Sequence, residues 1–296
     1  MDGVTHHKPT HNKGAKTPLF RTPLMVKMAP KRRFLRLPKF LGNRARDFRT
    51  FWGCLVFIAM SAMLTPPMHG AGFVFNDNFT VLTPAVPSQQ AADVYAAGLL
   101  EKAERYRKQV ALEWLGEELP PSVGKAIINV SYGVSQSALT WAKDRPDRKF
   151  HTVYLSGSVG QDFDALLAHE MVHVVLATRY PHPNRLAPWL EEGIASRYDD
   201  QERKATRDRI ARWFVKTGAY PGVIRALEAD TISPVDQETY AVCATMTELL
   251  LSRGTKRTLI EFGESGRSGW DAALVKYYGI ENVAELQAAW QGWVAR

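Results

Sequence analysis

The chain has 296 residues, enough for one well-buried domain with extensions. Its formal net charge of +8 is unevenly placed. Residues 1–50 carry thirteen Lys and Arg against two Asp, a balance of +11, whereas residues 51–296 carry twenty-five Lys and Arg against twenty-eight Asp and Glu, a balance of −3. The basic character therefore belongs to the tail, and without interleaved aromatic residues or a nucleic-acid-binding motif it does not indicate a nucleic-acid partner.

The first seventy residues read as a targeting segment. Residues 1–50 are rich in Pro, Lys and Arg, which predicts a disordered basic tail or the n-region of a signal. The apolar stretch 51–64 has fourteen residues, too few to cross a bilayer comfortably and typical of a signal-peptide core. Small residues at 70–72 offer a cleavage point. We therefore assign 51–71 to a signal peptide, which predicts export to the periplasm or beyond, or to an uncleaved anchor, which predicts membrane association through 51–64.

The segment before the central motif is predicted to be mixed α and β. Residues 72–88 read as a linker with short extended pieces. From 89 to 118 apolar residues recur at helical spacing, and Pro120-Pro121 ends that helix. Two short apolar runs, at 126–130 and 151–155, are candidate strands.

Residues 165–177 are the most informative segment, an apolar run interrupted only by His169, Glu170 and His173. Histidines four residues apart lie on one face of a helix, so both imidazoles can reach one metal ion. Glu170 is displaced around the helix and faces a water on that metal. Burying three polar side chains in an apolar helix requires partners for them, and a shared metal supplies one. Two hydrogen-bonded core histidines are the alternative interpretation.

The third ligand is predicted to be Glu192, which follows His173 after eighteen residues. Pro188 is suited to the first turn of a second helix. On that helix Glu191 and Glu192 lie about 100° apart, so one can face the metal while the other faces water. Three N or O ligands with an open fourth position are typical of catalytic zinc, so Zn²⁺ is the expected cofactor.

With the spacing HExxH-x18-E and the glycine that follows, residues 165–198 resemble the gluzincins, zinc peptidases whose third ligand is a distant glutamate. The chain is also similar to the small bacterial peptidase MA-like domains, loosely so over 90–164 and 236–294. The resemblance implies an α+β, zincin-like fold for residues 89–296. A small sheet would place its edge strand over the HExxH helix, and a mainly helical C-terminal subdomain would follow.

In such folds an edge strand just before the active-site helix often pairs with an extended peptide, and residues 151–155 are the expected edge strand. The aminopeptidases of this group carry Gly-x-Met-Glu-Asn near this point, and its glutamate holds the free amino group of the substrate. Here residues 154–158 read Tyr-Leu-Ser-Gly-Ser, which favours an endopeptidase.

Four further residues have predicted roles. Glu170 is expected to be the general base. Tyr240 is either the hydrogen-bond donor to the tetrahedral intermediate or a core tyrosine. Asp199 is a candidate acceptor for the second N–H of a metal-bound histidine. His182, in a Pro-flanked turn, is expected to be a loop residue at the cleft rim rather than a ligand.

The remaining segments are predicted to be helical. A charged amphipathic helix is expected at 201–218, an apolar helix at 238–252 and a final helix at 281–294, and together they would form the second wall of a cleft across the zinc. Cys54 would be lost with the signal peptide, so Cys243 would stand alone as a small core residue rather than form a disulfide.

The predicted function is a zinc-dependent peptidase, an endopeptidase acting on peptide or protein substrates. Two alternatives remain: a non-catalytic zincin-like binding domain tethered at the membrane surface, and a narrow self-processing protease that cleaves its own linker. The intact Glu170 argues against the first, because a scaffold would need the ligands but not the base. The oligomeric state is not predicted.

Overall fold

The computed structural model of the chain describes residues 71–86, 88–143, 149–158, 161–219 and 222–296. All of them belong to one compact unit, Ile58–Arg296. The predicted basic tail and the apolar stretch 51–64 lie outside these residues. In the part of the chain that is described, no helix is both long and apolar enough to cross a membrane.

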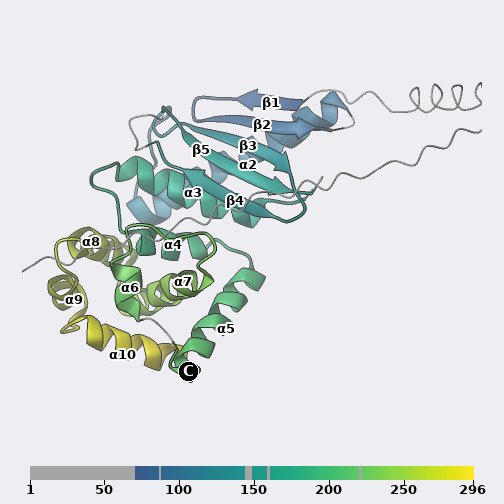
Figure 1. Cartoon of the computed structure of the whole chain (residues 1–296). Helices are drawn as coiled ribbons and strands as arrows, with labels where there is room; N and C mark the ends of the chain where they lie inside the picture. Colours follow the sequence, from purple (N-terminus) through teal and green to yellow (C-terminus); the bar gives the residue numbers. More distant parts are fainter. Residues whose placement is uncertain (1–70, 87, 144–148, 159–160, 220–221) are drawn as a thin grey trace, which may run out of the picture. The chain divides into compact units, whose positions relative to one another are not determined.

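A mixed five-stranded sheet forms the first part of the unit (Figure 1). Its strand order is β1-β2-β3-β5-β4, with parallel pairing of β2 with β3 and of β3 with β5, and antiparallel pairing at both edges. The strands are β1 (Ala71–Phe75), β2 (Phe79–Ala85), β3 (Ala126–Tyr132), β4 (Ser137–Trp141) and β5 (His151–Gly157).

Two sequence predictions are corrected here. The short extended pieces expected within a linker at 72–88 are β1 and β2, two strands of the sheet itself. The strand predicted at 151–155 is β5, but it lies between β3 and β4 and is not an edge strand. The edge strand next to β5 is β4, a strand that was not predicted from the sequence.

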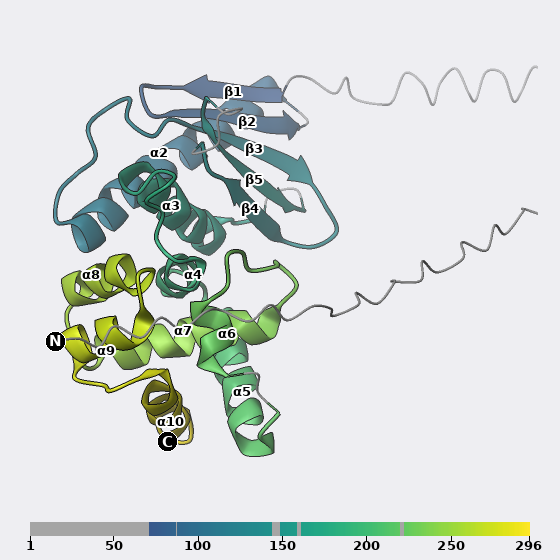
Figure 2. The ribbon, with the colours of Figure 1, turned by 60° about the vertical axis from the view of Figure 1, so that its left-hand side comes forward.

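Two helices, α2 (Gln89–Leu115) and α3 (Asp164–Arg179), lie side by side against the sheet, as both views show (Figure 2). Ser88 Oγ accepts a hydrogen bond from the Ala91 N–H and caps α2, and Gly116 ends it in the left-handed conformation with φ 78°. Side chains from the inner face of the sheet pack with side chains of α2 and α3 in one apolar core, and this packing holds α3 against the sheet. The core includes Phe79, Val81, Ile128, Val153, Leu155, Leu99, Leu167 and Met171.

The rest of the unit is helical, as predicted, so the α+β class is confirmed. The helices are α4 (Pro188–Ser196), α5 (Gln201–Thr217), α6 (Val223–Leu227), α7 (Gln237–Leu251), α8 (Lys256–Gly266), α9 (Trp270–Tyr278) and α10 (Val283–Val294). They share a second apolar core that includes Trp189 and Trp290, both fully buried. Cys243 lies in this core, as predicted.

The contact between α4 and α7 depends on Gly193, the residue after the predicted third ligand. A Cβ atom at this position would lie 2.7 Å from the Cys243 carbonyl oxygen and closer still to Thr247 Oγ1. Only glycine permits the two helices to approach so closely. This packing fixes the position of α4, and with it the direction in which Glu192 points.

Candidate metal centre

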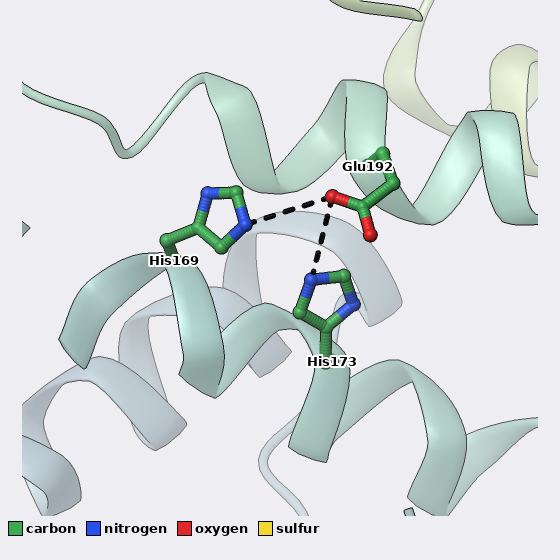
Figure 3. Close-up of side chains that lie close together, drawn as sticks. All are labelled: His169, His173 and Glu192. Atoms are coloured by element: carbon green, nitrogen blue, oxygen red, sulfur yellow. Dashed lines mark ion pairs between the residues drawn. The ribbon is translucent and has the colours of Figure 1, made fainter. Parts of the chain in front are cut away.

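The three predicted ligands lie together between α3 and α4 (Figure 3). His169 and His173 project from successive turns of α3, and Glu192 reaches them from α4. Glu192 Oε2 lies 3.6 Å from His169 Nε2 and 3.7 Å from His173 Nε2. All three candidate ligand atoms are within 4.8 Å of one another.

The donor set fits zinc. Glu192 Oε2 is buried and has no hydrogen-bond partner among the described residues, an arrangement that is costly unless a cation satisfies it. Two imidazole nitrogens and one carboxylate oxygen are ligands that zinc takes at catalytic sites. Tetrahedral ligands at about 2.1 Å from zinc are roughly 3.4 Å apart, close to the separations seen here.

Charge attraction within the cluster favours an ionised carboxylate. Burial by itself would raise the pKa of Glu192, but the neighbouring His173 and His169 imidazoles outweigh burial and lower it to about 2. Burial by itself would lower the pKa of His173, but Glu192 and Glu191 outweigh it and raise that pKa. Glu192 is therefore anionic at neutral pH, the form in which a carboxylate binds metal.

Asp199 forms a hydrogen bond with Nδ1 of His169, the ring nitrogen that faces away from the cluster, as predicted. Its Oδ1 lies 3.0 Å from His169 Nδ1, and the carboxylate is buried. The other oxygen, Oδ2, forms an ion pair with the guanidinium of Arg207 on α5. Because Asp199 occupies the Nδ1 side of the ring, His169 presents Nε2 to the cluster, which is the orientation a ligand requires.

The expectation that the second acid of the Glu191-Glu192 pair faces water is wrong. Glu191 is 2% exposed and its Oε2 lies 3.7 Å from His173 Nδ1. Arg185, in the loop before α4, donates to the same oxygen at 2.9 Å. Glu191 thus lies near Nδ1 of His173, just as Asp199 lies near Nδ1 of His169. Each of the two acids also forms an ion pair with an arginine.

Glu170 lies between the cluster and the sheet edge. It is 4% exposed, and its Oε2 accepts a hydrogen bond of 2.5 Å from Thr140 Oγ1 on β4. Glu170, the ligand cluster and β4 line one cleft with a volume of about 760 Å³. The predicted general base is therefore held against the edge strand and beside the candidate ligands.

Tyr240, on α7, lines the same cleft. Burial raises the pKa of its phenol, and the negative charge of Glu192 raises it further, so the hydroxyl keeps its proton. The guanidinium carbon of Arg207 lies 5.6 Å from the centre of the Tyr240 ring. The two alternatives for Tyr240, donor and core residue, both stay predictions, because the side chain is half-buried and lines the cleft.

His182 is exposed in the loop after α3 and is not part of the cluster, in line with its prediction as a loop residue. Sequence reasoning missed two residues of the site. Thr140 belongs to a strand that was not predicted. Arg207 occupies the buried stripe of α5 together with Ala211 and Phe214, at helical spacing. A charged residue at a position that the helical spacing predicts to be buried indicates a buried partner of opposite charge.

No family model matches the chain, and comparison with curated proteins finds no match either. The chemistry of the site must therefore come from its own residues. It offers two imidazoles and a carboxylate for one cation, a second carboxylate at hydrogen-bonding distance from the sheet edge, and a protonated phenol on the opposite wall.

Proposed function

We propose that the protein is a zinc-dependent peptidase with a zincin-like domain, acting as an endopeptidase on peptide or protein substrates. The observation that carries the proposal is the convergence of His169, His173 and Glu192, with Glu170 beside them in an open cleft. A domain kept only for binding would need the three ligands, but not a buried carboxylate held next to them by Thr140.

Zinc bound by the three ligands would supply an activated water and polarise the scissile carbonyl. Glu170 would accept the proton of the attacking water and deliver it to the leaving nitrogen. The hydrogen bond from Thr140 orients this carboxylate before substrate arrives. Tyr240, protonated and facing the cluster, would donate a hydrogen bond to the oxyanion as the carbonyl carbon becomes tetrahedral.

The cleft suits a peptide substrate that extends on both sides of the scissile bond. Residues 136–142 line the cleft along the whole length of β4, and residues 230–232 and Pro234 line it as well. An extended peptide can hydrogen-bond to the edge strand β4 as one more strand, with its scissile bond beside Glu170. The absence from residues 154–158 of the glutamate that binds a free amino group also favours internal cleavage.

The test is hydrolysis of an unbiased fluorogenic peptide library by the purified full-length chain and by Glu170→Gln, at equal measured zinc content. We expect cleavage by the parent and a loss of at least about a hundredfold in the variant. Glu202→Gln is the matched control, because Glu202 lines the same cleft and is exposed, outside the ligand cluster. Equal activity of parent and Glu170→Gln, or no zinc bound by the parent, would refute the proposal.

A further inference from the structure

A second cavity, of about 520 Å³, lies among the helices of the C-terminal part. It is bounded by α4, α5, α7 and α10, where α5 and α10 both pack against α7 (Figure 1). Arg207 lines both this cavity and the cleft of the candidate metal centre. We call this second cavity the α5–α10 pocket.

The charged side chains of the α5–α10 pocket are mainly cationic, although residues 51–296 as a whole carry a balance of −3. Two acids, Asp208 and Glu248, are its only anionic side chains among the described residues that line it. Five cationic side chains line it: Arg197, Lys204, Arg207, Arg212 and Arg296.

Internal ion pairs neutralise only part of this charge. Arg197 pairs with Glu248, and Arg207 pairs with Asp199 outside the pocket. Lys204 and Arg212 form no ion pair with any residue in the described part of the chain. They lie eight residues apart on α5 and so on the same side of the helix, with their charges directed at one cavity.

Apolar side chains also line the pocket, namely Ala244 of α7 and Trp293 and Val294 of α10. Concave sites with an apolar wall and a few convergent charges are typical of small-molecule binding. We propose that the α5–α10 pocket binds a small organic anion, whose phosphate or carboxylate group contacts Lys204 and Arg212 and whose apolar part packs against Trp293. This proposal does not depend on peptidase activity.

The probe is phenyl phosphate, titrated calorimetrically into the metal-free full-length chain so that the ligand cluster cannot bind it through zinc. Inorganic phosphate serves as the comparison. We expect phenyl phosphate to bind more tightly than inorganic phosphate, because only the former has a ring to place against Trp293. The double variant Lys204→Gln/Arg212→Gln should weaken phenyl phosphate binding by about tenfold or more.

The control is Arg209→Gln/Lys216→Gln, which removes the same two charges from α5 at exposed positions that do not line the pocket. It should bind phenyl phosphate as the parent does, and thermal unfolding should show both double variants folded. Absence of binding to the parent, or equal weakening in the two double variants, would overturn the proposal. The second outcome would mean that net charge rather than this pocket attracts the anion.

Discussion

Acidification is expected to destabilise the protein through His151, a buried histidine at the start of β5 and outside the ligand cluster. The Lys143 backbone N–H donates to His151 Nδ1 at 3.0 Å, so this nitrogen must be an acceptor. Nε2 lies 2.9 Å from Thr178 Oγ1, whose hydroxyl donates to the Val174 carbonyl at 2.6 Å. Nε2 therefore carries the proton, and only the neutral imidazole satisfies both contacts.

The size of the effect follows from the pKa. Burial lowers the pKa of His151 from 6.5 to about 4, and the positive charges of Lys143 and Arg185 contribute to this shift. Between these two values the unfolded chain binds one more proton than the folded protein, so the free energy of unfolding falls as the pH falls. The full difference is about 3 kcal/mol, of which roughly 2.5 kcal/mol is lost by pH 4.5.

The assay is urea unfolding of the metal-free full-length chain at pH 7.5 and pH 4.5, for the parent and for His151→Gln. Contributions from other titrating groups are common to both proteins, so the parent should lose about 2.5 kcal/mol more than the variant. The matched control is His182→Gln at an exposed histidine, which should follow the parent. If the parent and His151→Gln lose stability in parallel, His151 is not held neutral and the reasoning is wrong.

Three further changes probe the site and its packing. Asp199→Asn should weaken zinc binding by about 10- to 100-fold in a chelator competition, because it weakens the acceptor for His169; an unchanged zinc Kd would contradict that role. Thr140→Val should lower kcat of the proposed peptidase by about tenfold, for one lost hydrogen bond to a charged group, without changing zinc affinity. A parallel loss of zinc would instead indicate a structural defect. Gly193→Ala should destabilise the fold in urea by roughly 1–3 kcal/mol through overpacking, whereas Gly98→Ala, in a helix with nothing within 4 Å of the new Cβ, should stabilise it by up to about 1 kcal/mol. Equal effects of the two substitutions would refute the packing argument.

The parts of the fold that the sequence predicted are those set by local periodicity. The helices α2, α3 and α7 carry long apolar repeats, and their bounds fall within a few residues of the predicted ranges. The placement of His169 and His173 on one face follows from the same rule, since a helix fixes the relative positions of residues four apart.

Edge strands were missed because their apolar side chains do not mark the core. In β4 the small residues Ala138 and Thr140 are half-buried, while Leu139 and Trp141 are 40% and 44% exposed. In β4 the large apolar side chains therefore mark the exposed face of the strand and the small side chains mark the face toward the core. In β1 the large residues Phe73 and Phe75 are again exposed. Alternation predicts a strand only when its apolar side faces the core.

Side-chain contacts between different helices and loops could not be predicted from the sequence as the helices themselves were. The burial of Glu191 depends on Arg185, which a loop of irregular structure brings alongside α4. The pairing of Asp199 with Arg207 depends on how the turn after α4 sets the start of α5. In both cases the partner is fixed by tertiary packing, so neither the spacing nor the propensity of the residues involved could specify it.

The charges buried around the cluster give a separate reason to expect a divalent cation. Four carboxylates lie there, from Glu170, Glu191, Glu192 and Asp199, and all but Glu192 are less than 9% exposed. Two of them are neutralised by arginines: Glu191 by Arg185 and Asp199 by Arg207. Glu170 and Glu192 remain, and no arginine or lysine is paired with either of them within the described residues. Buried charges are stable only when they are compensated, and both histidines are neutral once they bind a metal. A dication such as the proposed zinc would then complement the two carboxylates that have no arginine or lysine partner.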